Sequence, residues 1–210
     1  MRTARNLAAV VLFLGCVAAA DAPRAVGDFE DQSDVGTVTP PGSVQYEPAK
    51  KEYRVTAAGE NIWGKADAFH FVFTKTGANE VVLSADVRFE GAGKNAHRKA
   101  CLMVRGGLAA DDPYADVAVH GDGLISLQFR KEKGGVTEEV QSKVKAPATV
   151  RLRRKGAGFT LEVAPPGKPF EAVGGVNVPL SNPVYAGLAV SSHEASVTET
   201  AVFSGLTFQR

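Results

Sequence analysis

Apolar and polar residues alternate along most of this chain, in short segments separated by Gly, Pro, Asn and Asp. Phe69, Phe71 and Phe73 share one parity, and the range 83–89 alternates just as regularly. This pattern predicts strands with one buried face, and no window keeps the i, i+3, i+4 apolar spacing of a full helix. Strands are also expected over 99–105, 114–120, 124–131, 149–155, 159–164, 185–193 and 199–208. Such strands bury their apolar faces by packing two sheets together, so we predict an all-β sandwich with a core ~10 Å thick.

The range 114–130 predicts one hairpin in detail. A two-residue turn would pair Val117 with Gln128, which places an apolar side chain opposite a polar one. A three-residue loop that ends in a left-handed Gly123 pairs Val117 with Leu127 instead. Directly opposite residues share a face, so the hydrophobic pattern selects the second register.

The N-terminus has the three-part build of a secretory signal peptide. Arg2 and Arg5 precede an apolar run over 7–17, and small residues end the segment at Ala20. An apolar run this short does not span the ~30 Å hydrocarbon layer of a bilayer, and no longer run follows. We therefore expect an exported protein without a transmembrane segment, divided into a signal peptide over 1–20, a short N-terminal segment over 21–26 and one domain over 27–210.

Cys16 gives the export signal a second interpretation. Residues 13–16 approximate the box at which bacteria attach a lipid to cysteine, although Phe13 stands where that box usually has Leu. A lipid on Cys16 would anchor the protein to the envelope, whereas cleavage after Ala20 would release it to the periplasm or beyond the cell. Cys101 is the remaining cysteine, so the sequence excludes a disulfide-stapled fold and the apolar core has to supply the stability.

The net charge is close to zero. Without Arg2 and Arg5 of the signal peptide, 24 basic residues become 22 against 23 acidic ones, a net charge of −1. Nucleic-acid binders carry a basic patch because neutralising phosphates drives their affinity, so no nucleic-acid partner is expected. The local basic cluster over 151–155 alternates along a predicted strand, and we interpret it as a solvated strand face.

Polar side chains gather on the predicted non-core parity of several strands, and all four histidines belong to this set or adjoin it. They are either independent groups satisfied by their neighbours or one collective ligand site. A solvated sheet face would contain more Lys, Glu and Thr, which favours a collective site. The candidate ligand-binding residues are His70, Arg105, Asp116, His120, Gln128 and His193. The same parity also carries Lys99, Cys101, Ser126, Arg130 and Ser191.

Trp63 lies in a loop that leads into the predicted His70 strand. A tryptophan beside a polar hollow stacks on a sugar ring while nearby amides and acids bind the hydroxyls. A lone tryptophan also commonly closes the end of a sandwich core. Both alternatives stay open, and on the first Trp63 joins the candidate ligand-binding residues.

Metal binding finds weaker support. Zinc ligands converge at ~2.0–2.3 Å, and no His-x-His or His-Glu-x-x-His spacing is present, so no metal ligands and no cofactor are assigned. Calcium is an alternative that the sequence leaves open. Its candidate oxygen ligands are Asp111, Asp112, Asp116 and Asp122.

Catalysis is not assigned to any residue. Glycoside hydrolysis normally needs two carboxylates ~5–9 Å apart. The Glu-x-Asp-x-x-Glu run of sandwich glucanases is absent, and Glu138 and Glu139 are adjacent, so they point to opposite faces of a strand. Asp116 and His120, with Arg105 as an anion clamp, suit proton transfer, yet no nucleophile signature such as Gly-x-Ser-x-Gly accompanies them.

Several segments together resemble a known family. They are 59–63, 67–71, 97–105, 114–124 and 191–193. The chain after the signal peptide resembles exported bacterial domains of unsettled function in the concanavalin A-like lectin/glucanase superfamily, which are often attached to Tol-type β-propeller proteins. The resemblance implies a jelly-roll sandwich of two antiparallel sheets, one of them concave. It assigns no catalytic residue, and any propeller partner would come from another chain.

Three functions of different classes follow. The first is a secreted or envelope-associated binding module for a carbohydrate or related polar ligand on the concave sheet. The second is an enzyme that acts on glycans or small metabolites through the His/Asp/Arg cluster on the same face. The third is a structural or interaction domain of the cell envelope. The absent run of paired carboxylates favours binding over hydrolysis, so we expect the binding module.

Overall fold

The computed structural model describes residues 25–210. Within this range the chain forms strands and no helix, and nearly all strands belong to two seven-stranded sheets. The predicted all-β sandwich is confirmed. The expectations for the signal peptide, for Cys16 and for residues 21–24 lie outside the described residues. Over 25–210 there is accordingly no helix of the length and apolarity that crossing a bilayer requires.

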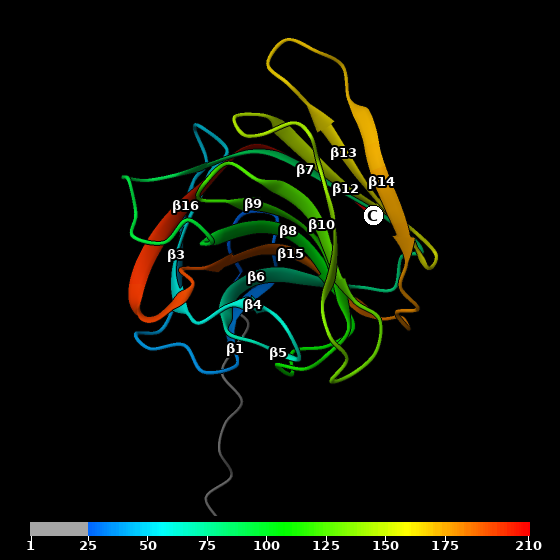
Figure 1. Cartoon of the computed structure of the whole chain (residues 1–210), viewed down its shortest axis with the longest axis horizontal. Coiled ribbons are helices and arrows are strands. Elements are labelled where there is room, and N and C mark those ends of the chain that lie inside the picture. The colour runs from blue at the N-terminus through cyan, green and yellow to red at the C-terminus, as the bar shows by residue number, and fades with distance from the viewer. Residues whose placement is uncertain (1–24) are drawn as a thin grey trace, which may run out of the picture.

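The first sheet carries most of the candidate site. All of its neighbouring strands pair antiparallel. Its strand order is β1 (Asp31–Val35), β6 (Phe69–Thr76), β15 (Val184–Ser191), β8 (Lys99–Arg105), β9 (Tyr114–His120), β10 (Ile125–Arg130) and β11 (Glu138–Gln141). In Figure 1 the labels β6, β15, β8 and β9 follow one another upward through the centre of the molecule.

The second sheet packs against the inner face of the first. Its strand order is β14 (Glu171–Asn177), β13 (Gly158–Ala164), β12 (Thr149–Lys155), β7 (Glu80–Phe89), β16 (Glu194–Gln209), β3 (Glu52–Gly59) and β2 (Ser43–Glu47). A separate short hairpin joins β4 (Ile62–Trp63) to β5 (Ala66–Asp67). In Figure 1 this hairpin appears below β6.

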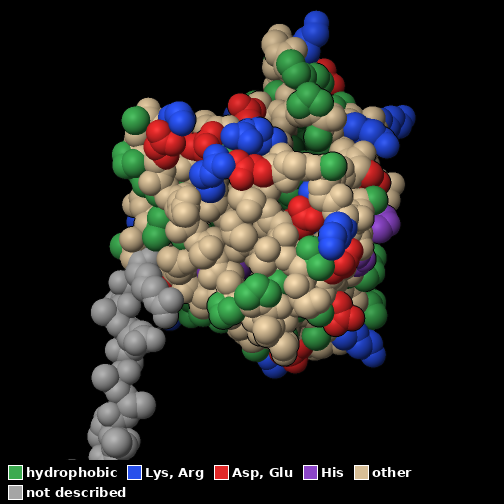
Figure 2. Space-filling model, turned by 90° about the vertical axis from the view of Figure 1, so that its left-hand side faces the viewer, with side chains coloured by type: hydrophobic (Ala, Val, Ile, Leu, Met, Phe, Trp, Pro, Cys, Tyr) green, Lys and Arg blue, Asp and Glu red, His purple; other side chains and the backbone are tan. Residues whose placement is uncertain are grey.

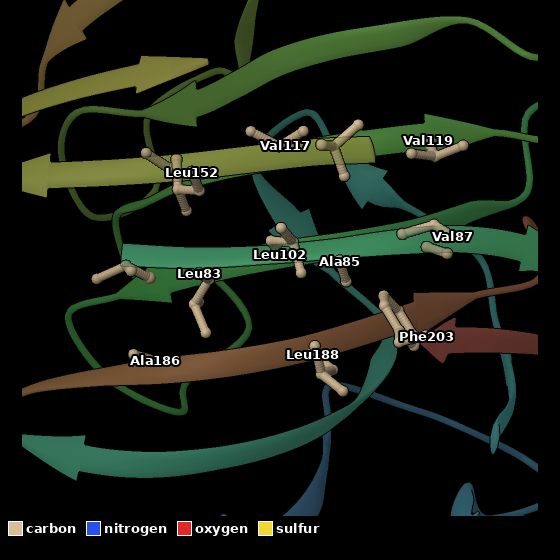
Figure 3. Packing of buried hydrophobic residues seen from close by; sticks show 14 of the residues in the cluster. Leu83, Ala85, Val87, Leu102, Val117, Val119, Leu152, Ala186, Leu188 and Phe203 are labelled. Carbon is tan, nitrogen blue, oxygen red and sulfur yellow. The ribbon is translucent and has the colours of Figure 1, made fainter. Parts of the chain in front are cut away.

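The main core fills the space between the two sheets. Leu102 and Val117 from the first sheet and Leu83 and Phe203 from the second are all 0% exposed. Figure 3 shows these side chains between the ribbons of the two sheets. Burying a side chain of this size contributes about 1.5–3 kcal/mol. The alternation that predicts the strands therefore also supplies the stability of the sandwich.

The β9–β10 hairpin has the predicted register. Val117 pairs with Leu127, and Asp116 pairs with Gln128. Gly123 has a φ of 85°, in the left-handed region that favours glycine. Its N–H donates to the carbonyl of His120 at 3.0 Å and closes the loop. The three-residue loop is confirmed.

Strand β6 has the opposite orientation to the one predicted. Val72 packs in the main core, whereas the three phenylalanines of β6 pack in a second apolar cluster on the outer face of the sheet. His70 shares the parity of Val72, so its expected place on the same face as Asp116 was wrong. Both faces of β6 are buried, so alternation alone does not indicate which face meets the main core.

The basic cluster over 151–155 is solvated only in part. Arg151 and Arg153 form ion pairs with Glu162 on the outer face of the second sheet. Arg154 has the core parity and is 2% exposed. Its guanidinium donates to the carbonyls of Ala78 and Leu180 at 3.0 and 3.1 Å. Arg154 lies near the end of β12, where its guanidinium contacts backbone carbonyls. A residue at a core position usually contacts apolar side chains instead.

The outer face of the second sheet is otherwise a solvated, charged surface. Arg54 pairs with Glu90, and Arg88 lies 3.3 Å from Glu52. Figure 2, which looks at the side of the molecule formed by β3 and β16, shows basic and acidic side chains next to one another. This surface matches the composition expected of an ordinary exposed sheet, in contrast to the outer face of the first sheet.

Candidate ligand-binding site

Three neighbouring strands of the first sheet place polar side chains on its outer face. Lys99 of β8 pairs with His120 of β9, and Asp116 of β9 pairs with Gln128 of β10. Because directly opposite residues share a face, these side chains point to the same side of the sheet. All four are at most 5% exposed. The strands thus present a polar but largely covered surface.

A pocket of about 280 Å³ opens above this surface. Trp63, on the β4–β5 hairpin, forms part of its wall and is 37% exposed. The interpretation of Trp63 as a core residue is therefore wrong. The pocket is lined by Asn61, Trp63, His97, Lys99, His120, Leu124, Gln128, Glu139, Gln141 and His193.

A larger depression adjoins this pocket. It has a volume of about 700 Å³ and shares Asn61, Trp63 and His193 with the smaller one. Its other lining residues come from the segments around Thr37, Glu60 and Ala110. Trp63 therefore lies where the two hollows meet, and an extended ligand has room on both sides of the indole.

Several buried polar atoms beneath the pocket have unused hydrogen-bonding capacity. Gln128 Nε2 lies 3.3 Å from His120 Nε2. Within residues 25–210, neither Gln128 Oε1 nor His120 Nδ1 has a hydrogen-bond partner, and the same holds for Ser126 Oγ. Neither oxygen of the Asp116 carboxyl has a hydrogen-bond partner in the described chain. Burial without a partner costs roughly 1–3 kcal/mol for each group, so these atoms retain the capacity to form a hydrogen bond.

Burial shifts the ionisation of the same groups. It raises the pKa of Asp116 well above its usual range, which favours the neutral acid. Burial and the Lys99 charge lower the pKa of His120 to about 4, and burial lowers the pKa of His193. Burial also lowers the pKa of Lys99. The pocket therefore disfavours charge on its own side chains wherever water is excluded.

A buried cluster of three charged residues holds the β4–β5 hairpin against the sheet. Asp67 Oδ2 accepts from Arg105 Nη1 at 3.1 Å, and Asp67 Oδ1 accepts from Arg130 Nη2 at 2.7 Å. The side chains of all three residues are 0% exposed. Arg130 also donates to the carbonyl of Gly64 at 3.1 Å, in the turn beside Trp63. We call Asp67, Arg105 and Arg130 the arginine clamp.

The structure brings some of the predicted residues together and separates others. Trp63, His120, Gln128 and His193 line the 280 Å³ pocket, and Asp116 lies on the same sheet face beneath its polar floor. Arg105 is on this face too, but its guanidinium is committed to the arginine clamp and to the carbonyls of the segment at 107–109.

His70 is the predicted residue that lies elsewhere. Its Nδ1 is 2.7 Å from Asp34 Oδ1, and its Nε2 is 3.1 Å from Gln32 Oε1. Both partners belong to β1, the neighbouring edge strand. His70 therefore ties β1 to β6 on the face of the sheet opposite the pocket.

Sequence reasoning did not select several residues that line the pocket. Glu138 and Glu139 are adjacent and point to opposite faces of β11, which excludes them as a catalytic pair. Glu139 nevertheless pairs with Gln128 across β10 and β11 and so reaches the pocket face. Asn61 accepts a hydrogen bond from Lys99 Nζ at 2.5 Å across a separation of 38 residues. The alternation of residues along β11 could have predicted that Glu139 faces the pocket. No local sequence pattern predicts the contact between Lys99 and Asn61.

The acidic residues considered for calcium are engaged in separate contacts. Lys133 Nζ donates to Asp111 and Asp112 at 2.6 and 2.9 Å. Asp122 Oδ1 accepts the N–H of Leu124 in the hairpin loop at 3.0 Å. Among residues 25–210 no group of three or more His, Cys, Asp or Glu side chains converges in a way that would hold a metal ion.

No family model and no curated protein matches this sequence. Solved structures are similar to it in fold. A functionally unknown protein from Saccharomyces cerevisiae is 17% identical with a TM-score of 0.61, over 80% of this chain and 91% of that one. The carbohydrate-binding module CBM66 from Bacillus subtilis is 14% identical with a TM-score of 0.55, over 87% and 98%. A β-glucanase from Bacillus licheniformis is 9% identical with a TM-score of 0.52, over 85% and 92%. At these identities the likeness shows the fold, a jelly roll of the lectin/glucanase type.

Proposed function

We propose that this protein binds a carbohydrate in the pocket beside Trp63. The observation that carries the proposal is an exposed indole next to buried polar atoms that have no partner within residues 25–210. A sugar ring offers an apolar face and a rim of hydroxyl groups. Trp63 suits the face, while Gln128 Oε1 and His120 Nδ1 suit the hydroxyls.

The energetics support a polar ligand of this kind. A hydroxyl that pairs with a buried, unsatisfied atom recovers part of the roughly 1–3 kcal/mol that the unpaired atom costs. The two adjoining hollows, of about 280 and 700 Å³, are of the size of typical ligand sites, ~300–1,000 Å³. The names of two similar structures, a carbohydrate-binding module and a β-glucanase, agree with this function.

Export to the cell envelope completes the proposal. The charged start, apolar run and small-residue end of residues 1–20 support it. Mass spectrometry of the protein from its native host should find an N-terminus at Asp21 or a lipid on Cys16. An unprocessed chain that begins at Met1 would contradict export.

The binding function is tested by a glycan array followed by calorimetry with the glycans that bind. We expect Trp63→Ala and Gln128→Ala to raise the Kd at least tenfold while the melting temperature stays within a few degrees of the wild type. Phe170→Ala and Gln45→Ala are matched controls, since these residues lie on the second sheet or its loops and outside the pocket lining. An array without binders, or equal losses in the controls, would refute the proposal.

A further inference from the structure

Lys99 is a buried cation that lacks a counter-ion. The residue is 3% exposed, and its ammonium donates to Asn61 Oδ1 at 2.5 Å. In the described part of the chain no carboxylate forms an ion pair with it. A neutral amide oxygen is a poor substitute for a carboxylate at a buried ammonium, because removing the charge from water costs several kcal/mol. The side chain nevertheless lines the 280 Å³ pocket.

The groups that line this part of the pocket beside Lys99 are imidazole rings. The ring of His97 lies 5.6 Å from that of His193 and 6.3 Å from that of His120, measured between centroids. All three rings and Lys99 line the same pocket. Nitrogen donors on an ammonium and on imidazole rings hydrogen-bond most strongly to anionic oxygens. Lys99 therefore supplies the ammonium and the imidazole rings supply further hydrogen-bonding nitrogens, and together they form one corner of the pocket.

Asp116, Glu139 and Asp67 favour the charge of Lys99 electrostatically, but none of them forms an ion pair with it. Asp116 is 0% exposed, and its burial favours the protonated form. Glu139 accepts from Gln141 Nε2 at 2.6 Å and from Gln128 Nε2 at 3.5 Å. Its negative charge is thus directed to side-chain amides of β10 and β11.

We propose that the carbohydrate taken by this pocket carries an anionic substituent, a carboxylate or a sulfate, which binds Lys99 in the corner formed with His97 and His193. This inference rests on the proposed function and specifies its ligand class. The anionic oxygens supply the counter-charge that the buried ammonium lacks, and the sugar ring packs against Trp63 in the same pocket.

Matched ligands test the inference on the wild-type protein. D-Glucuronate, D-glucose 6-sulfate and D-glucose share one ring and differ in charge, and sodium acetate and sodium sulfate supply the anion alone. Titration calorimetry at low ionic strength should give at least tenfold tighter binding of one or both charged sugars than of glucose, and weaker binding of the simple anions.

The outcomes separate the two proposals. Equal affinities for glucose and both charged sugars would overturn the anionic ligand class and leave a carbohydrate site in place. Simple anions that bind as tightly as the charged sugars would retain the anion site and refute the carbohydrate function. A failure of both charged sugars to bind would overturn the inference.

A charge-removing variant locates the effect. Lys99→Met keeps the length of the side chain and should abolish the preference for the charged sugars without lowering the melting temperature, because it removes an unpaired buried charge. Lys65→Met removes an exposed charge from the same β4–β5 hairpin and should keep the preference. Preference retained in Lys99→Met, or lost equally in Lys65→Met, would overturn the assignment to Lys99. If Lys99→Met fails to fold, the wild-type comparison still decides the ligand class.

Discussion

Asp116 is the most completely buried carboxyl group beneath the pocket. Burial raises its pKa in the folded state, so between about pH 4 and that raised value the native protein holds a proton that the unfolded chain has released. Linkage then makes the stability fall as the pH rises through this window. The acid is stabilising when neutral and costly when ionised.

Replacing Asp116 with Asn should remove this pH dependence, since the amide resembles the neutral acid. We expect Asp116→Asn to melt a few degrees above the wild type at pH 8, with the difference shrinking toward pH 4; about 1 kcal/mol corresponds to roughly 2–4 °C. Calorimetric melting over this range measures it. Asp122→Asn, at the exposed hairpin loop, should show no such trend. A lower melting temperature for Asp116→Asn at pH 8 would contradict this account.

His120 makes the opposite contribution. Its pKa is about 4 in the folded protein and 6.5 ordinarily, so the unfolded chain takes up a proton first as the pH falls. The neutral His120 ring therefore contributes its full stabilisation above about pH 6.5. Acidification toward pH 4 removes this stabilisation, which is on the order of 3 kcal/mol. His120→Gln should flatten this part of the stability profile in urea titrations at pH 7, 5.5 and 4.5. An unchanged acid slope would show that His120 is protonated in the native state.

At the scale of single elements, the loop of the β9–β10 hairpin closes at one glycine. A side chain at Gly123 would meet its nearest neighbour at 3.6 Å, so the cost of substitution comes from the φ of 85° and not from crowding. We expect Gly123→Val to lower the free energy of unfolding by more than ~1 kcal/mol. Gly77→Val is the control, because its site is open and its φ lies outside the left-handed region. Equal urea midpoints for the two variants would contradict the strained-turn interpretation.

The arginine clamp is the second element that positions the site. Asp67→Asn leaves two buried guanidinium groups without their carboxylate, and breaking a buried pair in this way typically costs about 3–5 kcal/mol. Trp63 is the chain's single tryptophan, so its emission should shift to longer wavelength as the hairpin loosens. Glu162→Gln is the matched control, because Glu162 also pairs with two arginines but on the outer face of the second sheet. This variant should lower the free energy of unfolding by under ~1 kcal/mol. An unshifted Trp63 emission in Asp67→Asn would show that the clamp does not position the indole.

These elements also show what the sequence predicts and where prediction fails. The bounds of β8, β9 and β12 and the hairpin register followed from alternation, because one face of each strand is apolar and the other polar. The orientation of β6 did not follow, because its outer face is also buried, in a second apolar cluster. The arginine clamp joins Asp67 to positions 38 and 63 residues away, and no local pattern encodes such contacts.

The same distinction applies to the candidate site. Parity brought Asp116, His120 and Gln128 to one face correctly, since they belong to one hairpin whose register the apolar residues fix. Arg130 of the arginine clamp donates to the turn beside Trp63, and Lys99 donates to Asn61. Both contacts join residues far apart in the chain, so neither was visible in the sequence.

At the scale of the whole molecule, the two outer faces of the sandwich have different roles. The second sheet turns partly exposed ion pairs such as Arg151–Glu162 toward solvent. The first sheet turns buried, partly unsatisfied polar groups toward a pocket, while its inner face packs in the main core (Figure 3). A rigid sheet backed by a packed core holds such groups in place before a ligand arrives, which lowers the entropic cost of binding.

The fluorescence emission of Trp63 tests most directly the claim that a carbohydrate binds in this pocket. Trp63 is the chain's single tryptophan, so all tryptophan emission comes from the wall of the proposed pocket. A glycan that binds on the array should change this emission saturably, with the same Kd as calorimetry, and the change should disappear in Gln128→Ala. A glycan that binds by calorimetry and leaves the Trp63 emission unchanged would place the carbohydrate elsewhere on the protein and contradict the account.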